Sequence, residues 1–246
     1  MDVVAGVDGL EPSHGPIFAV IGVFDGLHRG HAYLLEHLVR EAAARAAKSC
    51  VITFDHHPDE VLTGSAPPLL LDPTERLERL ASAGIDVTVV QHFDETVRHI
   101  PYDRFIAMIR DRTELAGLLM TPDAAFGFER RGTPDAVAAL GRSSGFDVVV
   151  VPTLILEGAP VRSSDIRKAI ADGHLAAAER LLGRPVALRG RVAAGTITFD
   201  WPMALPPAGA YACAIDGRVA RLEVGDGAIR VNGDVPDGVA EIVLGS

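Results

Sequence analysis

One stretch near the N-terminus constrains the fold of this 246-residue chain more than any other. Residues 17–23 form a short apolar run that predicts a buried strand, and a turn containing glycine and two histidines follows directly. A helix is then predicted for 32–47, because apolar residues recur there at helical spacing. His31 is expected in the first turn of that helix. The N-terminal region is therefore predicted to contain a strand–turn–helix unit.

The composition of this turn is typical of an anion-binding site. Gly22, Gly26 and Gly30 allow backbone conformations, or a close approach to the backbone, that a side chain would prevent. The N–H groups at a helix start carry partial positive charge. His28 and His31 are expected to face one side of the junction and to bind a phosphate, with added charge as imidazolium. In the alternative interpretations the histidines cap the helix or bind zinc.

A zinc site would need further ligands than these two histidines. Only His56 and His57 lie at another predicted strand end, so no protein-held metal is expected. The two cysteines, Cys50 and Cys213, are far apart and have neither metal nor redox spacing. This cysteine usage is typical of a reducing cytoplasm, which is the expected location.

Short apolar runs alternate with helical patterns over the first 152 residues. The predicted strands are 17–23, 50–54, 87–91, 117–120 and 148–151, and the predicted helices are 32–47, 73–83, 102–111 and 134–144. This alternation predicts an α/β fold with a doubly wound parallel sheet, whose ligands bind at the carboxyl ends of the strands. His28, His57 and Phe126 each follow a predicted strand closely, which indicates one shared crevice.

Residues 163–182 are predicted to form two helices separated by Gly173. Ser163 and Ser164 precede the apolar positions of the first of these helices, so they are expected at its N-cap or in its first turn. With Arg167 they would make a second phosphate-binding site. The alternative is an ordinary serine cap followed by a solvated arginine, and the residue types alone do not separate the two.

The sequence changes character after Pro185. Short apolar stretches occupy 187–192, 210–215, 219–224, 228–231 and 239–244, and the hairpin signals are Asp216-Gly217, Asp226-Gly227 and Asn232-Gly233. They predict an antiparallel barrel or meander of about 60 residues. The predicted domains are therefore 1–186 and 187–246.

Composition narrows the classes of partner. Hydrophobic residues make up 48% of the chain and the formal net charge is −10. This acidity counts against nucleic acid and a membrane surface as partners. No secretion signal is recognised at the N-terminus, and no apolar run is long enough to cross a bilayer. A small anionic substrate stays compatible, because Arg and His can cluster locally, and a homo-oligomer is left open.

Five sequence blocks, in order, carry a family resemblance. They are the stretch Gly22 to His31, Thr53-Phe54-Asp55-His56-His57-Pro58, the loop Asp123 to Gly132, Val161-Arg162-Ser163-Ser164-Asp165-Ile166-Arg167, and Leu181-Leu182-Gly183-Arg184-Pro185. Together they resemble the His-x-Gly-His nucleotidyltransferases in the version found in bacterial FAD synthetases, which are bifunctional riboflavin kinase/FMN adenylyltransferases. Two departures concern the acceptor side: His56 replaces a proline, and Ala124 stands where an aromatic residue is usual.

The resemblance implies transfer of AMP from ATP to FMN, giving FAD and pyrophosphate, with Mg²⁺ bound to ATP. The catalytic residues it implies are His28, His31 and Arg167. The ATP-binding residues it implies are Gly22, Phe24, Asp25, Gly26, Gly30, Ser163 and Ser164. The flavin-binding residues it implies are His57, Pro58, Asp123, Phe126 and Phe128. Phe126 and Phe128 would point in opposite directions in an extended segment, so at most one is expected to stack on the flavin, and either could instead fill core.

The C-terminal region departs from the family pattern. The family kinase carries Gly-Phe-Pro-Thr-Ala-Asn, whereas this chain has Thr198-Phe199-Asp200-Trp201-Pro202-Met203. The Thr–Asn pair and the later chain that supplies the kinase base are absent, which predicts that riboflavin phosphorylation is lost. Trp201 is then either an interface anchor or a packing residue.

Two other functions fit the same sequence. The altered blocks around His56 and Ala124 would suit a nucleotidyltransferase acting on a modified flavin or another phosphorylated acceptor. The altered kinase region would suit a non-catalytic flavin- or nucleotide-binding protein.

Overall fold

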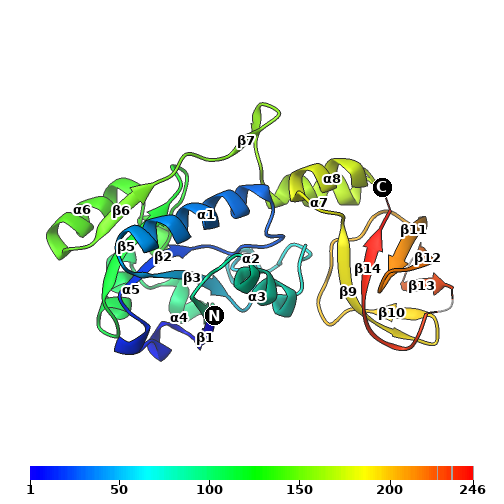
Figure 1. The fold of residues 1–246 in the computed structure, drawn as a ribbon, viewed down its shortest axis with the longest axis horizontal. Helices are drawn as coiled ribbons and strands as arrows, with labels where there is room; N and C mark the ends of the chain where they lie inside the picture. The colour runs from blue at the N-terminus through cyan, green and yellow to red at the C-terminus, as the bar shows by residue number, and fades with distance from the viewer. Residues whose placement is uncertain (226, 234, 246) are drawn as a thin grey trace. The chain divides into compact units, whose positions relative to one another are not determined.

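The computed structural model describes residues 1–225, 227–233 and 235–245. It forms two compact units (Figure 1). The first contains residues 1–24, 31–67 and 77–154, and the second contains 25–30, 68–76 and 155–246. The expected domain boundary at residue 186 therefore falls inside the second unit, which also takes two short segments from the first third of the chain.

The first unit is built on a six-stranded parallel sheet in the order β1-β4-β3-β2-β5-β6. Its strands are β1 (Asp2–Ala5), β2 (Ile17–Ile21), β3 (Lys48–Phe54), β4 (Val87–Gln91), β5 (Leu115–Met120) and β6 (Asp147–Val150). This confirms the predicted doubly wound parallel sheet. The strand β1 was not predicted; it pairs in parallel with β4, from Asp2 opposite Val87 to Ala5 opposite Val90.

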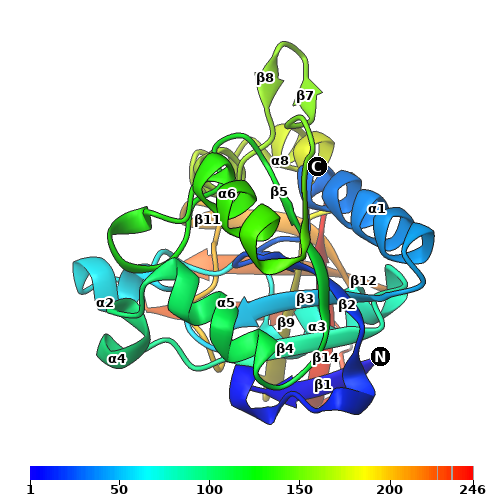
Figure 2. The same ribbon diagram turned by 90° about the vertical axis from the view of Figure 1, so that its left-hand side faces the viewer.

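Helices connect these strands. They are α1 (Arg29–Ala44), α2 (Asp59–Thr63), α3 (Pro73–Ser82), α4 (Glu95–Arg98), α5 (Tyr102–Arg110) and α6 (Pro134–Ser144), with short 3₁₀ turns at Val7–Gly9, Pro12–His14 and Phe128–Arg130. His31 is the third residue of α1, so its predicted first-turn position is confirmed. The short helices α2 and α4, which were not predicted, lie side by side (Figure 2).

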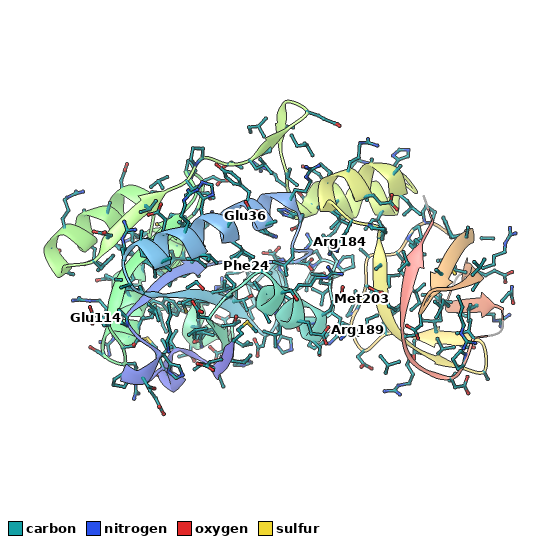
Figure 3. The ribbon with its side chains drawn as sticks, viewed as in Figure 1. Phe24, Glu36, Glu114, Arg184, Arg189 and Met203 are labelled. Carbon is teal, nitrogen blue, oxygen red and sulfur yellow. The ribbon has the colours of Figure 1, made fainter. Side chains whose placement is uncertain are left out.

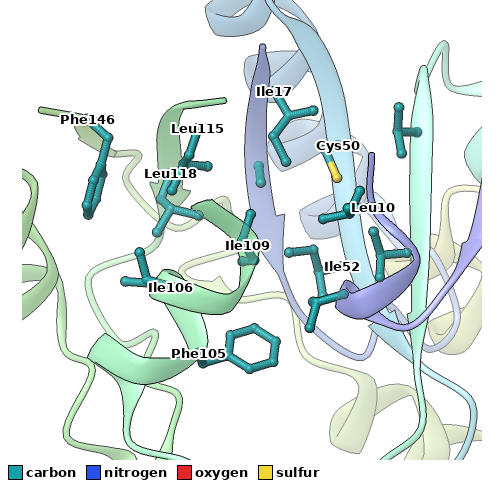
Figure 4. Close-up of a cluster of buried hydrophobic side chains, with 14 of the residues drawn as sticks. Leu10, Ile17, Cys50, Ile52, Phe105, Ile106, Ile109, Leu115, Leu118 and Phe146 are labelled. Carbon is teal, nitrogen blue, oxygen red and sulfur yellow. The ribbon is translucent and has the colours of Figure 1, made fainter. Parts of the chain in front are cut away.

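The main core of the first unit lies between one face of the sheet and α5 (Figure 4). Alternate residues of β2, β3 and β4 point into it, because successive side chains of a strand face opposite ways. The sheet contributes Ile17, Ala19, Cys50, Ile52, Val87 and Val89, and α5 contributes Phe105, Ile106 and Ile109. Every one of these side chains is buried. This packing fixes the directions of the strand ends that carry the site.

Phe18 faces the other side of the sheet. The guanidinium of Arg45, just past α1, lies 4.7 Å from the centre of the Phe18 ring. On β5 a Cβ at Gly117 would lie 2.4 Å from that ring. Gly117 therefore makes room for Phe18 between neighbouring strands.

The second unit contains a short hairpin, two helices and a closed antiparallel barrel (Figure 1). The hairpin strands are β7 (Ile155–Leu156) and β8 (Ala159–Pro160), and the helices are α7 (Ser163–Ala171) and α8 (Leu175–Leu182). The barrel strands are β9 (Ala187–Ala193), β10 (Thr196–Thr198), β11 (Gly209–Ile215), β12 (Arg218–Gly225), β13 (Ala228–Asn232) and β14 (Gly238–Leu244), in the order β10-β13-β12-β11-β14-β9. The predicted barrel and the two predicted helices are confirmed.

The hairpin predictions have different outcomes. Asp216-Gly217 joins β11 to β12, and both residues have positive φ, 46° and 78°, as a two-residue hairpin turn requires. Asn232-Gly233 does not form a hairpin: β13 pairs with β10 and β12, while β14 pairs with β9 and β11. Closure of the barrel determines which strands pair with β13 and β14, and a two-residue turn signal in the sequence carries no information about closure. In Asp226-Gly227, Asp226 lies outside the described residues.

The structure also bears on membrane-spanning helices and on the two cysteines. In the described part of the chain, no helix has the length and apolar character needed to cross a membrane. Cys50 and Cys213 are free and buried, and burial raises the pKa of the Cys50 thiol to about 12. Cys50 is therefore a packing residue rather than a reactive thiol.

Candidate functional site

A cavity of about 630 Å³ lies in the first unit, where strands β2 to β5 end. Its lining includes residues at or just past the carboxyl ends of these strands: Ile21, Gly22, Phe54, Phe93 and Thr121. The strand order reverses between β2 and β5, and such a reversal is where doubly wound sheets bind ligands. The walls are mostly apolar and aromatic, as in pockets for flat organic ligands.

All five predicted flavin residues line this one cavity: His57, Pro58, Asp123, Phe126 and Phe128. They come from the segment after β3 and from the loop after β5, so the fold brings together residues about 65 positions apart in the sequence. His57 is largely buried, and its Nδ1 accepts a hydrogen bond from the backbone N–H of Asp59 at 3.2 Å. Asp123 is exposed, and the Thr121 hydroxyl donates to its carboxylate at 2.8 Å.

The loop after β5 is closed by its own backbone. Phe126 and Gly132 form an antiparallel bridge, in which Gly132 N–H donates to Phe126 O at 2.9 Å. Phe128 N–H donates to the carbonyl of Ile100 at 2.8 Å. The segment is therefore not extended, so the opposite directions expected of an extended segment do not apply, and both Phe126 and Phe128 line the cavity.

Gly127 and Gly132 let this loop lie directly on α5. A Cβ at Gly127 would lie 2.5 Å from Tyr102 N, and one at Gly132 would lie 2.6 Å from Tyr102 Cβ. Gly127 also has a φ of +74°, a conformation that favours glycine. The two glycines thus allow this loop, which carries Phe126 and Phe128, to contact Tyr102 closely.

Two cations line the cavity that were not predicted as site residues. Arg98, at the end of α4, pairs with Glu95 at 2.8 Å, and its guanidinium donates to Val61 O at 3.4 Å. Arg130 is exposed in the loop after β5, at the arginine position of the Phe-Gly-x-x-Arg-x-Gly block. The block itself was the signal for Arg130. No sequence signal pointed to Arg98, because its position at the cavity depends on contacts with residues far away in the sequence, such as Val61.

The second unit holds the turn of residues 25–30 around a buried carboxylate. Asp25 is 2% exposed. Its carboxylate accepts hydrogen bonds from Leu70 N–H at 3.0 Å and Leu71 N–H at 3.1 Å. Arg167 lies 2.6 Å from the other carboxylate oxygen. These bonds and the ion pair hold the Asp25 carboxylate in place within the second unit.

Helix α7 begins against the same turn. Ser163 and Ser164 are its first two residues, which confirms their predicted first-turn positions. The Ser163 hydroxyl donates to the backbone carbonyl of Asp25 at 2.9 Å, and Arg167 donates through Nε to Pro68 O at 2.9 Å. Ser164 is exposed. Within the second unit, residues 25–30 of the turn therefore lie against the start of α7.

His28 is buried within the second unit, with 4% of its surface exposed. Its pKa is lowered from 6.5 to about 4, chiefly by burial and then by the positive charges of Arg184 and Arg167. Arg184, labelled in Figure 3, follows α8 and donates to Gly26 O at 2.8 Å. With this pKa the ring of His28 is neutral at pH 7, so it offers a hydrogen bond without the added charge of an imidazolium.

The turn glycines act through contact as well as conformation. Gly26 has a φ of +83°, and a Cβ there would lie 2.8 Å from Leu70 Cδ1. A Cβ at Gly30 would lie 3.1 Å from His28 Cε1 and 3.3 Å from Val161 O. Both glycines therefore set the position of the His28 ring and of the loop that binds Asp25.

The remaining predicted residues of this region belong to the first unit. Phe24 is buried and has a positive φ of 54°, which is strained for an aromatic residue. Its ring centre lies 5.1 Å from that of His31. A Cβ at Gly22 would lie 3.1 Å from the Phe24 ring. Phe24 therefore sets the orientation of the His31 imidazole.

The fold is a doubly wound α/β unit with a C-terminal barrel, and a solved structure shares it. That structure, titled a macrolide-efflux protein from Streptococcus pneumoniae, matches with a TM-score of 0.85 and covers 99% of this chain and 90% of that chain. At 22% identity, the likeness concerns the fold alone.

Sequence comparison identifies the family. Residues 10–165 match the family described as FAD synthetase. Two curated bifunctional riboflavin kinase/FMN adenylyltransferases, from Pseudomonas fluorescens and Escherichia coli strain K12, are 34% identical over 196 and 199 residues. Each match covers 79% of this chain and 63% of the relative, so the chain spans less than two thirds of their length. This chain belongs to the FAD synthetase family.

Proposed function

We propose that this protein transfers AMP from ATP to FMN, giving FAD and pyrophosphate. The observation that carries the proposal is the cavity of the first unit, because all five residues implied for flavin binding line it. Its aromatic walls suit a flat ring system, and Arg98 and Arg130 offer positive charge for a phosphate. The turn after β2 continues directly from the cavity residues Gly22 and Val23.

ATP is assigned to the His-x-Gly-His turn and the start of α7. Arg167 uses Nε and Nη2 in its bonds to Pro68 and Asp25, and an arginine has five N–H donors. The buried bonds hold the guanidinium in place, and its other donors bind the β- and γ-phosphates. Ser163 and Ser164 add the N-terminal end of α7, where partial positive charge favours phosphate.

The reaction is an in-line displacement. A phosphate oxygen of FMN forms a bond to the α-phosphorus of ATP, the bond from that phosphorus to the oxygen bridging to the β-phosphate breaks, and pyrophosphate leaves with that bridging oxygen. Neutral His28 donates a hydrogen bond to the phosphate oxygens, and His31 does the same from the first turn of α1. The work of the protein is alignment and charge stabilisation.

Mg²⁺ enters as the complex with ATP, and it neutralises charge on the phosphates. Asp25, the carboxylate of the turn, is already bonded to Leu70, Leu71 and Arg167. The residues of the turn therefore fit a metal ion held through phosphate oxygens rather than through Asp25, as is usual for Mg²⁺ with nucleotides.

We also propose that riboflavin kinase activity is absent. The altered segment is used structurally: Met203 forms a parallel bridge with Leu69 and is 7% exposed. Leu69 N–H donates to Pro202 O at 2.7 Å, and Ala204 N–H donates to Leu69 O at 2.8 Å. Where the family motif has Thr and Asn, this chain has backbone bonds that hold the loop carrying Leu70 and Leu71.

A modified flavin phosphate is the second candidate acceptor. Ala124 lines the cavity where the family usually has an aromatic residue, so the cavity has more space at this point. A larger ring system would use that space. The chemistry on the ATP side would be unchanged.

The test is product analysis with purified protein, Mg-ATP and FMN. We expect FAD and pyrophosphate in equal amounts, and a rate lower by ~10²–10³-fold in His28→Ala and in His31→Ala. FMN left unconverted while a modified flavin phosphate is adenylylated would support the second candidate. Tight nucleotide binding with no pyrophosphate from any acceptor would contradict both.

A further inference from the structure

Three side chains outside the residues assigned above meet where β3 and β4 end. Asp55 and His56 follow β3, and His92 follows β4. Each offers a ligand atom, and these atoms all lie within 4.8 Å of one another. His92 Nδ1 lies 2.6 Å from Asp55 Oδ2, and His56 Nδ1 lies 3.3 Å from the same oxygen.

The carboxylate of Asp55 is fixed in place by the backbone. Its Oδ1 accepts hydrogen bonds from His56 N–H at 2.8 Å and from Phe93 N–H at 3.2 Å. Asp55 N–H in turn donates to Gln91 O at 3.1 Å. These bonds tie the ends of the two strands together and direct Oδ2 toward both imidazoles.

We propose that Asp55, His56 and His92 form a binding site for a divalent transition-metal ion, of which Zn²⁺ is the best fit. Two imidazole nitrogens and one carboxylate oxygen are a common zinc ligand set, with a fourth position for water or a substrate atom. The three side chains are 31%, 40% and 66% exposed, so solvent reaches that position.

The distances agree with this ion. Tetrahedral zinc with bonds of about 2.0–2.1 Å places its ligand atoms roughly 3.3 Å apart. The His56–Asp55 separation already has this value, and the His92–Asp55 pair must open by less than 1 Å. Exposed side chains make such a shift at little cost. Mg²⁺ and Ca²⁺ prefer all-oxygen ligands, so the site is distinct from the metal that accompanies ATP.

The charge of the site also suits a cation, because the Asp55 carboxylate lies within 3.3 Å of a ring nitrogen of both histidines. Metal binding would require both rings in their neutral form. His56 stands where the family pattern has proline, so the site would belong to this chain rather than to the family.

The site lies beside the cavity wall. Phe54 and His57 flank Asp55 and His56 in sequence, Phe93 follows His92, and all three flanking residues line the cavity. The Phe54 and Phe93 rings are in edge contact, with centres 5.3 Å apart. A bound ion would therefore restrain both segments of the wall.

The test is equilibrium dialysis of the full chain against Zn²⁺ after removal of metal, with Co²⁺ absorption as a probe of geometry. We expect one Zn²⁺ per chain, retained in millimolar Mg²⁺. Outer-shell changes already weaken zinc sites by ~10–100-fold, so His92→Gln should weaken binding by about 100-fold or more, and His56→Gln similarly. The Co²⁺ spectrum should lose its tetrahedral bands in both variants.

His99→Gln is the matched control. His99 is also exposed and has one carboxylate partner, Glu95, at 3.6 Å. The His99→Gln variant should bind Zn²⁺ as tightly as the parent does. The proposal would be overturned if the double variant His56→Gln/His92→Gln bound Zn²⁺ as tightly as the parent does. It would also be overturned if His99→Gln lost as much Zn²⁺ affinity as His56→Gln or His92→Gln. The thermal unfolding temperature without metal shows whether each variant is folded.

Discussion

The ionic state of His28 is the most distinctive property of a single residue in this chain. Its pKa of about 4 means that, between pH 4 and 6.5, the ring is neutral in the folded protein although an exposed histidine would be charged. Three donors on neighbouring residues, from Leu70, Leu71 and Arg167, hold Asp25 in the same turn. In the proposed reaction, this turn would therefore offer the phosphates of ATP a neutral donor, His28, and a fixed cation, Arg167.

The first prediction concerns stability against pH. The folded pKa of His28 lies below the unfolded value of 6.5, so the unfolded chain binds the proton more readily between pH 6.5 and 4. Its contribution to stability is complete above pH 6.5 and decreases as the pH falls through this range, by about 3 kcal/mol at most. His28→Gln removes this decrease.

Urea unfolding at several pH values measures how the free energy of unfolding depends on pH. The free energy of unfolding should fall less steeply with decreasing pH in His28→Gln than in the parent. Parallel curves would show that His28 titrates normally in the folded protein.

The second prediction concerns the ion pair between Arg167 and Asp25. Both side chains are largely buried, and removing one partner leaves a buried charge uncompensated. Arg167→Met should therefore lower the free energy of unfolding by about 3–5 kcal/mol and weaken ATP binding together. Lys168→Met on the same helix is the control, because its pair with Asp172 is exposed and contributes little to stability.

Chemical unfolding and nucleotide titration measure the two effects. An Arg167→Met protein as stable as the Lys168→Met protein would show that Asp25 is held by the backbone N–H groups alone.

At the scale of elements, strand ends and helix starts do most of the positioning. The cavity wall is made by segments that follow β2, β3, β4 and β5, together with the short helices α2 and α4. The loop after β5 supplies both phenylalanines, and it is held to α5 by close glycine contacts and by the Phe126–Gly132 bridge.

The third prediction tests this loop. Gly127→Ala adds a Cβ that would lie 2.5 Å from Tyr102 N, in addition to the strain of a positive φ. The loop must move, so flavin affinity should fall by at least about tenfold, an energy of ~1.4 kcal/mol. Gly145→Ala at the end of α6 is the matched control: its φ is +80°, and no atom lies within 4 Å of the added Cβ.

Quenching of FMN fluorescence gives the affinities, and unfolding in urea gives the stabilities. Gly145→Ala should cost ~1–2 kcal/mol for its left-handed conformation, and Gly127→Ala should cost more, because φ 74° with ψ 175° is a conformation that only glycine ordinarily adopts. Only Gly127→Ala should lose flavin affinity. Equal affinities in the two variants would mean that the loop does not set the cavity.

The elements that the sequence predicted share a physical origin. Buried strands and amphipathic helices have local patterns, so the central strands and both Ser163–Leu182 helices were located within a few residues. The edge strand β1 was missed, because its pairing with β4 depends on residues more than 80 positions away. The hairpin expected at Asn232-Gly233 failed for the same reason, since closure of the barrel overrides the local turn signal.

The site shows the same contrast between features with a local sequence pattern and features that depend on distant residues. The motif residues were identified, but their roles depend on contacts that no motif shows. Asp25 is bonded to Leu70 and Leu71, in a loop 45 residues later. His92 meets His56 because β3 and β4 are neighbours in the sheet. Both contacts join segments that are far apart in the sequence, so no local pattern reports them.

At the scale of the whole molecule, the barrel is a structural part of the second unit rather than an independent appendage. The bridge between Leu69 and Met203 ties the segment 202–204 to the loop whose N–H groups hold Asp25. The residues that replace the family's kinase motif thus support the turn that carries His28.

The fourth prediction is the absence of riboflavin phosphorylation. With Mg-ATP and riboflavin, the protein should form no FMN and release no ADP, because the Thr–Asn pair is replaced within residues 198–203. Chromatography of the flavins measures this, with FMN as substrate in a parallel reaction as the control. FMN formed from riboflavin would show that another part of the chain performs the kinase reaction.

The most direct test of AMP transfer follows the phosphorus atoms of ATP. With ATP labelled at the α-phosphorus and unlabelled FMN, the label should appear in FAD; with ATP labelled at the γ-phosphorus, it should appear in pyrophosphate. A flavin labelled from the γ-position would contradict AMP transfer, and so would consumption of α-labelled ATP with no label in any flavin product.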